Sequence, residues 1–372
     1  MSDLGSVARE AKAWLLDHAA PLWATAGVTS DGLFAEAIDL TEKPVATPRR
    51  MKVLARQIYS FCEIGLLGWS GPWREIVERA LEKTLKPLRR GDGLFVHTIA
   101  LDGTVADARA DLMDHAFILF ALAYAARALK RSELVTLAHE IMDLIEARWS
   151  NAHGGYDEGE AVSALPRRQN PHMHMFEAML ALYDTSGESR WHNAADAISN
   201  LCARRFIDPE SGALREYFTS HWEPAGSDGR IVEPGHCFEW AWLMQRNPHD
   251  PVRIELADGL MSFARRYGID RARNVAIYEV MTDGTLRDNS ARLWAQTERL
   301  KAALPRWRRT KERAEATEIV AAYRGLAQYF DTPIAGAWRD RMLANGAFNQ
   351  EPAPASSLYH IVCAISELVR AV

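Results

Sequence analysis

Hydrophobic residues recur at helical spacing along most of the chain. Near the start, Leu4, Val7, Ala11 and Leu15 follow an i, i+3, i+4 pattern that predicts an amphipathic helix. Similar patterns predict about twelve helices in all. Alternate helices are expected to begin roughly 60 residues apart, which is about the length of two helices and a loop. Their expected starts are near Pro48 (with Thr47 as N-cap), Asp111, Pro171, Pro234, Ala291 and Leu358.

The alternate helices include the most apolar segments of the chain, HAFILFALAYAA and LYHIVCAISELV. A helix that is apolar on all sides is buried, so these helices are expected inside a ring and their partners outside it. We therefore predict an all-α fold, an (α/α)6 barrel of six helical hairpins, forming a single catalytic domain over residues 1–372. Asp102-Gly103 and Asp283-Gly284 predict short β-hairpin loops between helices.

Composition narrows the function classes. Hydrophobic residues make up 48% of the 372 residues, charged residues 25%, and the net charge is −5, which is usual for a soluble globular protein. Nothing suggests the concentrated basic face of a nucleic-acid binder. No apolar run reaches the roughly 18 residues that span a bilayer, so no membrane association is expected. The start of the chain is charged and amphipathic, unlike a signal peptide.

The four cysteines, Cys62, Cys202, Cys237 and Cys363, are far apart and form no CxxC pair. This spacing gives no support to a disulfide framework or a thiol-rich metal site. We therefore expect reduced thiols and a cytoplasmic protein.

Residues capable of chemistry gather near the expected starts of the inner helices. They are Arg50 in the first turn of the first, His115 and Phe117, Asn170, His174 and Glu177, His236 and Glu239, Trp294 and Glu298, and His360. In a closed ring these turns face one rim. A single histidine is more often structural than catalytic, but the same placement in several hairpins favours one shared pocket of sugar size.

Two histidines have a glutamate one turn later, since His174 precedes Glu177 and His236 precedes Glu239 at i, i+3 spacing. A carboxylate beside an imidazole can fix its tautomer and raise its basicity. The alternative is a surface pair worth a few tenths of a kcal/mol, which the apolar neighbours disfavour.

Two other chemistries have to be weighed. His172 and His174 resemble an HxH chelate, but on a helix residues two apart point to different sides, so we predict no metal. The sequence has no P-loop or Rossmann glycine motif, so we predict no other cofactor. Glycoside hydrolysis would need two opposed carboxylates, which Glu177, Glu239 and Glu298 could supply. That alternative leaves the histidines unexplained.

The stretches RRQNPHMHMFEAMLALYD, IVEPGHCFEWAWLM, RLWAQTERLKA and LYHIVCAI resemble the N-acylglucosamine 2-epimerase superfamily, over nearly the whole chain. That family includes cellobiose 2-epimerases and D-mannose isomerases. The resemblance implies an (α/α)6 barrel, no redox cofactor, no essential metal and acid–base proton transfer on a sugar.

The resemblance also implies roles for individual residues. His236 and His360 match the family's two acid/base histidines, and His174 its third active-site histidine. The remaining matches are Asn170 as a sugar-binding amide, Arg50 as the active-site arginine, Glu239 as the partner of the acid/base histidine and Trp294 as a pocket aromatic. His115, Phe117 and Glu298 are expected to help bind the substrate.

These residue types suit removal of the C2 proton of a sugar. Imidazole has a pKa near neutral pH, and arginine can stabilise an enediolate. The wording DGRIVEPGHCFEWAWLM is most similar to the mannose-isomerase branch. We therefore predict isomerisation of the monosaccharide D-mannose to D-fructose by a monomer or homodimer. A sugar 2-epimerase and a non-catalytic carbohydrate-binding protein are the alternatives.

Overall fold

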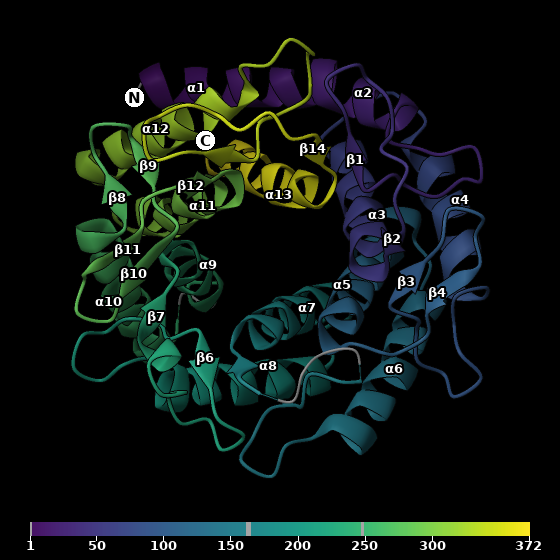
Figure 1. Ribbon diagram of the computed structural model, residues 1–372, viewed down its shortest axis with the longest axis horizontal. Coiled ribbons are helices and arrows are strands. Elements are labelled where there is room, and N and C mark those ends of the chain that lie inside the picture. Colours follow the sequence, from purple (N-terminus) through teal and green to yellow (C-terminus); the bar gives the residue numbers. More distant parts are fainter. Residues whose placement is uncertain (1, 161–164, 247–248) are drawn as a thin grey trace.

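The computed structural model describes residues 2–160, 165–246 and 249–372. Its helices form two concentric rings (Figure 1). The inner helices are α3 (Met51–Leu66), α5 (Leu112–Leu129), α7 (Asn170–Ser186), α9 (Pro234–Met244), α11 (Leu293–Thr310) and α13 (Ser356–Ala371). The outer helices are α4 (Trp73–Leu85), α6 (Glu133–Trp149), α8 (Ser189–Leu201), α10 (Pro251–Tyr267), α12 (Arg313–Ala327) and α1 (Ser2–Ala13) with α2 (Ala20–Thr25).

The ring closes between its first and last inner helices. Helix α13 packs against α3, and the outer helix α1 packs against both α13 and α12. A π-helical turn, Trp14–Ala19, joins α1 to α2. The predicted (α/α)6 barrel is confirmed, because alternate helices are inside and their partners outside (Figure 1).

Helix α5 explains why the inner set could be recognised. Every residue from Leu112 to Leu129 except Arg127 is buried. The side chain of Asp111 caps the helix by accepting a hydrogen bond from the backbone N–H of Asp114 at 3.1 Å. Contrary to the sequence prediction, this helix is long and apolar enough to cross a membrane by length and composition, but 94% of it is buried inside the protein. Packing in the barrel accounts for its apolar character.

Short antiparallel strands hold the starts of the inner helices. The strands are β1 (Ala37–Ile38), β2 (Arg49–Arg50), β3 (Thr98–Ile99), β4 (Val105–Asp107), β5 (Arg167–Arg168), β6 (Tyr217–Phe218), β7 (Ile231–Val232), β8 (Ile269–Asp270), β9 (Val275–Ala276), β10 (Glu279–Met281), β11 (Leu286–Asp288), β12 (Ala291–Arg292), β13 (Arg341–Met342) and β14 (Ala353–Pro354). Strands β2, β5, β7, β12 and β14 each directly precede an inner helix. Each pairs with a strand of a neighbouring hairpin, as β14 does with β1.

One sequence expectation about a helix start was wrong. Helix α3 begins at Met51 rather than Pro48, because Arg49 and Arg50 pair with β3 as an extended strand.

The two predicted hairpin turns are confirmed. Gly103 and Gly284 each have a φ of +83°, which glycine adopts without steric cost. The preceding aspartates accept hydrogen bonds from Thr104 N–H at 2.9 Å and Thr285 N–H at 3.0 Å. They connect β3 to β4 and β10 to β11 at the rim of the barrel.

Candidate active site

A cavity of about 290 Å³ lies at the end of the barrel where the inner helices begin, a size that suits a small ligand. It is lined by Arg50, Lys52, Arg56, Met113, Arg168, Asn170, His174, Glu233, His236, Glu239, Tyr278, Arg292, Trp294, Ser356, Ser357 and His360. Seven residues predicted from the sequence are therefore brought together here. They are Arg50, Asn170, His174, His236, Glu239, Trp294 and His360.

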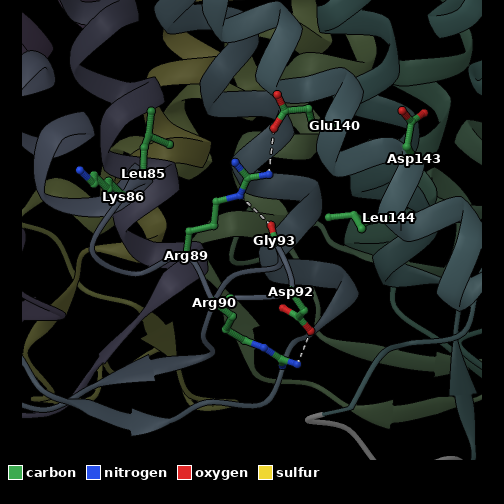
Figure 2. A pocket seen from close by; sticks show the side chains of 10 residues that line it. Leu85, Lys86, Arg89, Arg90, Asp92, Gly93, Glu140, Asp143 and Leu144 are labelled. Atoms are coloured by element: carbon green, nitrogen blue, oxygen red, sulfur yellow. Dashed lines mark hydrogen bonds and ion pairs between the residues drawn. The ribbon is translucent and has the colours of Figure 1, made fainter.

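A larger groove on the outside of the barrel offers no comparable chemistry. It lies beside α4 and α6 and has a volume of about 740 Å³ (Figure 2). Its arginines are already paired. Arg89 donates to Glu140 and to the carbonyl of Gly93, and Arg90 donates to Asp92. These ion pairs are those of a solvated surface, so the histidine-lined cavity is the better candidate.

His236 lies in the first turn of α9 and has acidic side chains around it. Its Nδ1 lies 3.0 Å from Oε1 of Glu216 and 3.8 Å from Oε2 of Glu233. Burial opposes protonation, but the carboxylates of Glu216 and Glu233 outweigh it and raise the pKa of His236 to about 10. The ring is therefore an imidazolium at neutral pH. The expected pairing of His236 with Glu239 was wrong, because Glu216 reaches Nδ1 from the loop before β6.

The other side of the His236 ring meets Asn170 and Trp294. The amide Nδ2 of Asn170 lies 2.9 Å from Nε2 of His236, and Oδ1 of the same amide has no hydrogen-bond partner. Because a charged imidazole donates from both nitrogens, the amide turned by half a rotation would accept through Oδ1. Trp294 lies 4.8 Å from the His236 ring, and a Cβ at Gly235 would approach it to 2.5 Å. Glycine at 235 thus allows the indole to reach the histidine.

His360 has the opposite character. Its Nδ1 lies 2.8 Å from Oε1 of Glu298, a fully buried carboxylate whose other oxygen lies 2.7 Å from Nζ of Lys301. Burial, together with the nearby cations Arg56 and Lys301, lowers the pKa of His360 well below its ordinary value. This ring is therefore neutral. With Nδ1–H donated to the carboxylate, the lone pair of Nε2 is left free.

His174 forms the predicted pair with Glu177, with Nδ1 3.2 Å from Oε2. The hydroxyl of Tyr359 donates to the same carboxylate oxygen. Burial outweighs the effect of Glu177 and lowers the pKa of His174 to about 4. The ring of Phe117 lies 4.4 Å from the His174 ring.

Glu239 lines the cavity with an unsatisfied carboxyl group. Its Oε1 is buried without a hydrogen-bond partner in the described structure. Burial and the nearby Glu298 raise the pKa of Glu239 well above its ordinary value. A protonated Glu239 could donate a hydrogen bond to a sugar oxygen.

Arg50 and Arg56 both line the cavity, so either could be the active-site arginine that the sequence predicts. Arg50 is the last residue of β2 rather than part of the first helical turn, and its guanidinium donates to Glu36 at 2.6 and 3.0 Å. The sequence prediction chose Arg50 over the nearby Arg56. It lies 4.0 Å above the Phe117 ring and 5.1 Å from the Tyr359 ring. Its buried Nε has no partner in the described structure, so Arg56 retains donors for a ligand.

Three predicted substrate-binding residues, Phe117, His115 and Glu298, do not line the cavity. His115 accepts from the N–H of Phe95 at 3.0 Å through Nε2, and its Nδ1 contacts the carbonyl of Asp111 at 2.7 Å. Both ring nitrogens are therefore used within the fold. Glu298 instead accepts a hydrogen bond from Nδ1 of His360.

The sequence prediction also missed a repeated arginine. Arg50, Arg168 and Arg292 each lie just before an inner helix, and each pairs with a carboxylate, respectively Glu36, Glu158 and Asp340. All three line the cavity. The signal was present, because arginine occurs one or two residues before α3, α7 and α11, which are alternate inner helices.

Several groups of side chains around the cavity carry atoms that can bind a metal. Donor atoms of His174, Glu177 and Glu239, of Glu216, Glu233 and His236, and of Glu239, Glu298 and His360 approach within 4.8 Å of one another. Several of these atoms already bond within the protein, and the cation Lys301 lies 4.0 Å from Glu239. His172 points elsewhere, since its Nε2 accepts from the N–H of Tyr156. The HxH pair therefore does not converge.

The arrangement favours proton transfer over glycoside hydrolysis. Of Glu177, Glu239 and Glu298, only Glu239 is among the described residues that line the cavity. Glu177 and Glu298 instead hydrogen-bond to His174 and His360. The charged His236 and the neutral His360 could serve as an acid and a base in the same cavity.

Most of the chain is similar in sequence to known proteins. The sequence model of the N-acylglucosamine 2-epimerase (GlcNAc 2-epimerase) family matches residues 32–364. A mannose-6-phosphate isomerase of Rhizobium meliloti (strain 1021) is 40% identical over 98% of this chain and 97% of its own. A D-mannose isomerase of Thermobifida fusca is 29% identical over 72% of this chain and 71% of its own.

Solved structures share the fold. The cellobiose 2-epimerase of Bacillus thermoamylovorans B4167 has a TM-score of 0.90 at 18% identity, covering 99% of this chain and all of that one. A D-mannose isomerase has a TM-score of 0.88 at 21% identity, covering 100% of this chain and 98% of that one.

Proposed function

The chain belongs to the N-acylglucosamine 2-epimerase family and is a sugar isomerase or 2-epimerase, and we propose that it isomerises D-mannose to D-fructose. The observation that carries the proposal is the opposite protonation of two histidines in one cavity. His236 is charged and His360 neutral, and both rings face Trp294 at 4.8 and 5.9 Å. An aldose–ketose isomerase needs such an acid and base on one small substrate.

In this proposal His360 removes the C2 proton of the open-chain aldose through Nε2. The resulting enediolate accepts hydrogen bonds from Arg56, whose guanidinium has unused donors. His360 then returns the proton to C1. During ring opening His236 gives its proton to the ring oxygen and takes up the proton that leaves the O1 hydroxyl. It later gives that proton to O1 of the enediolate and takes the proton of the O2 hydroxyl. Asn170 and Trp294 fix the ring of His236 in place.

Mannose is the proposed substrate because two relatives point to it. Relatives at 40% and 29% identity are named as isomerases of mannose 6-phosphate and of D-mannose. The likeness to the cellobiose 2-epimerase is one of fold at 18% identity. A 2-epimerase is therefore the alternative, and a non-catalytic sugar-binding protein is disfavoured by the intact acid/base set.

A phosphorylated mannose is a second candidate, supported by the charge of the cavity mouth. Five arginine or lysine side chains and the charged His236 line the cavity, against the carboxyl groups of Glu233 and Glu239. Burial raises the pKa of Glu233 to about 7 and also raises the pKa of Glu239 well above its ordinary value. Among the described residues, Lys52 has no carboxylate at ion-pair distance. An ammonium without a partner suits the dianion of a phosphate.

We also propose a metal-independent cytoplasmic enzyme. Its four cysteines are free and buried, which supports a reducing compartment.

Product analysis tests these proposals together. The protein would be incubated with D-mannose, mannose 6-phosphate, D-glucose, cellobiose and N-acetylglucosamine, and the products identified by NMR. We expect fructose from mannose. Glucose as the main product would establish the epimerase instead, and no conversion of any sugar would establish a binding protein. A kcat/KM for mannose 6-phosphate at least tenfold above that for mannose, reduced selectively by Lys52→Met, would establish the phosphorylated substrate.

A further inference from the structure

We propose that Lys301 is a positioning residue that keeps Glu298 ionised and so holds His360 in the tautomer whose Nε2 lone pair faces the cavity. Lys301 itself does not line the cavity. The inference rests on the proposed base role of His360 for its effect on catalysis, whereas the tautomer can be measured without any substrate.

The contacts form a chain of three groups. Lys301 lies one turn after Glu298 on α11 and is fully buried. Its Nζ lies 2.7 Å from Oε2 of Glu298, and Oε1 of Glu298 lies 2.8 Å from Nδ1 of His360 on α13. The ammonium therefore holds one oxygen of the carboxylate while the imidazole uses the other.

Other groups facing Lys301 come from neighbouring inner helices. Glu239 of α9 lies 4.0 Å from Nζ, and the thiol of Cys363 on α13 lies 3.7 Å away. The ring of Trp242 on α9 lies 3.9 Å from the ammonium. Glu177 of α7 acts on Lys301 at longer range. No other cation contacts Glu298 among the described residues, so Lys301 is its counter-ion.

Loss of this cation would change the protonation state of Glu298. Burial raises the pKa of Glu298, and Lys301 opposes that shift. A buried carboxylate without a counter-ion takes up a proton rather than remain charged. Protonated Glu298 would donate to Nδ1 of His360, and the ring proton would then move to Nε2. A base carrying its proton on Nε2 cannot accept one from the sugar.

The first test is the tautomer of His360 in the unmodified protein. Two-dimensional ¹⁵N NMR of labelled histidine distinguishes Nδ1–H from Nε2–H, and the His360→Asn variant assigns the signal. We expect Nδ1–H. An Nε2–H tautomer in the unmodified protein would overturn the proposal without any substitution of Lys301, and it would do so even if no sugar were converted.

The second test uses Lys301→Met, which keeps the length of the side chain and removes the charge. We expect kcat to fall by about 10- to 100-fold, the usual effect of losing a group that orients a functional side chain. KM should change little, and His360 should lose the Nδ1–H signal. Lys311→Met, at the exposed end of the same helix, is the control and should leave kcat unchanged.

The decisive comparison is Lys301→Met combined with Glu298→Gln. The neutral amide that replaces the carboxylate needs no counter-ion and can accept from Nδ1 of His360 through its oxygen. The double variant should therefore regain the Nδ1–H tautomer and be more active than Lys301→Met alone. The two substitutions could instead lower kcat independently, so that their fold-losses multiply, and leave the tautomer of His360 the same in every variant. That result would mean that Lys301 only stabilises the fold.

Discussion

Glu216 and His236 form an ion pair at 3.0 Å between a loop before β6 and the first turn of α9. Both carboxylate oxygens are engaged, because Oε2 of Glu216 also accepts from Gln169 at 2.9 Å. The orientation of the carboxylate is thus fixed, and it holds a proton on the imidazole. In the proposed mechanism, this pair suits His236 to the role of the acid.

The first prediction follows from that charge. His236 must be protonated and His360 neutral, so activity is lost as the pH rises through the pKa of His236, about 10. On the acid side it is lost only below the depressed pKa of His360. We expect kcat/KM to stay constant over a broad range around neutral pH. The measurement should extend from below roughly pH 6, near the ordinary pKa of histidine, to above the pKa of His236, about 10.

Glu216→Gln removes the carboxylate that most raises the pKa of His236, so the alkaline limb should move to lower pH. Glu233→Gln is the matched control and should move it less, because its oxygen lies at 3.8 Å. The acid limb should stay in place in both variants. An alkaline limb that is unchanged in Glu216→Gln would remove His236 from the role of acid.

The second prediction concerns the two histidines themselves. His236→Asn and His360→Asn should each lower kcat by about 10²- to 10⁴-fold, the usual contribution of a positioned acid or base. Circular dichroism should remain that of the native protein. His115→Asn gives a useful contrast, since His115 is bonded within the fold. It should lower stability more than kcat. A His236 or His360 variant that keeps half of the activity would show that residue to be misassigned.

The third prediction separates the two arginines. Arg56→Lys should lower kcat strongly, because an ammonium cannot present the planar fork of a guanidinium to two neighbouring oxygens. Arg50→Lys should have a smaller effect, mainly on KM, because Arg50 is paired with Glu36 at the mouth. The reverse ranking of the two variants in steady-state kinetics would return the enediolate contact to Arg50.

The sequence predicted the barrel because helical periodicity and the contrast between inner and outer helices are local properties. It also predicted much of the cavity, because residues near the starts of inner helices must meet at one rim. His174 and Glu177 could be paired from their i, i+3 spacing, since both belong to one helix.

Partners from distant segments could not be predicted in this way. His236 has a glutamate at i+3, yet it pairs with Glu216, which is 20 residues earlier and reaches it from a loop. Arg56 was passed over in favour of Arg50 for a similar reason. Its burial depends on the rings of Phe117 and Tyr359, which come from two other helices. Spacing along the chain carries no information on such contacts.

The fourth prediction is that dialysis against a strong chelator leaves the rate unchanged. Candidate metal ligands do approach one another around the cavity, but Glu216, Glu177 and Glu298 already accept hydrogen bonds from histidines. Lys301 also supplies positive charge beside Glu239 and Glu298. Metal analysis of the purified protein would accompany the assay. Complete loss of activity restored by one divalent ion would contradict the acid–base proposal.

The last prediction uses solvent deuterium to separate isomerase from 2-epimerase. Both reactions pass through an enediolate formed by removal of the C2 proton, so pH profiles do not distinguish them. An isomerase adds the new hydrogen at C1, whereas a 2-epimerase adds it at C2 from the opposite face. Mannose incubated in D₂O and followed by NMR therefore reports the carbon that receives the proton.

We expect fructose labelled at C1, because the neutral and the charged histidine have different tasks. His360 is a neutral base that can take the C2 proton, and the same nitrogen can return it to C1 on the same face. A 2-epimerase would require a second group to deliver to C2 from across the sugar, and after that delivery His236 would be left neutral beside Glu216 and Glu233, which favour its charged form. Partial labelling would mean that His360 keeps some of the abstracted proton. Glucose labelled at C2 as the main product would instead assign that delivery to His236 and place the enzyme among the 2-epimerases.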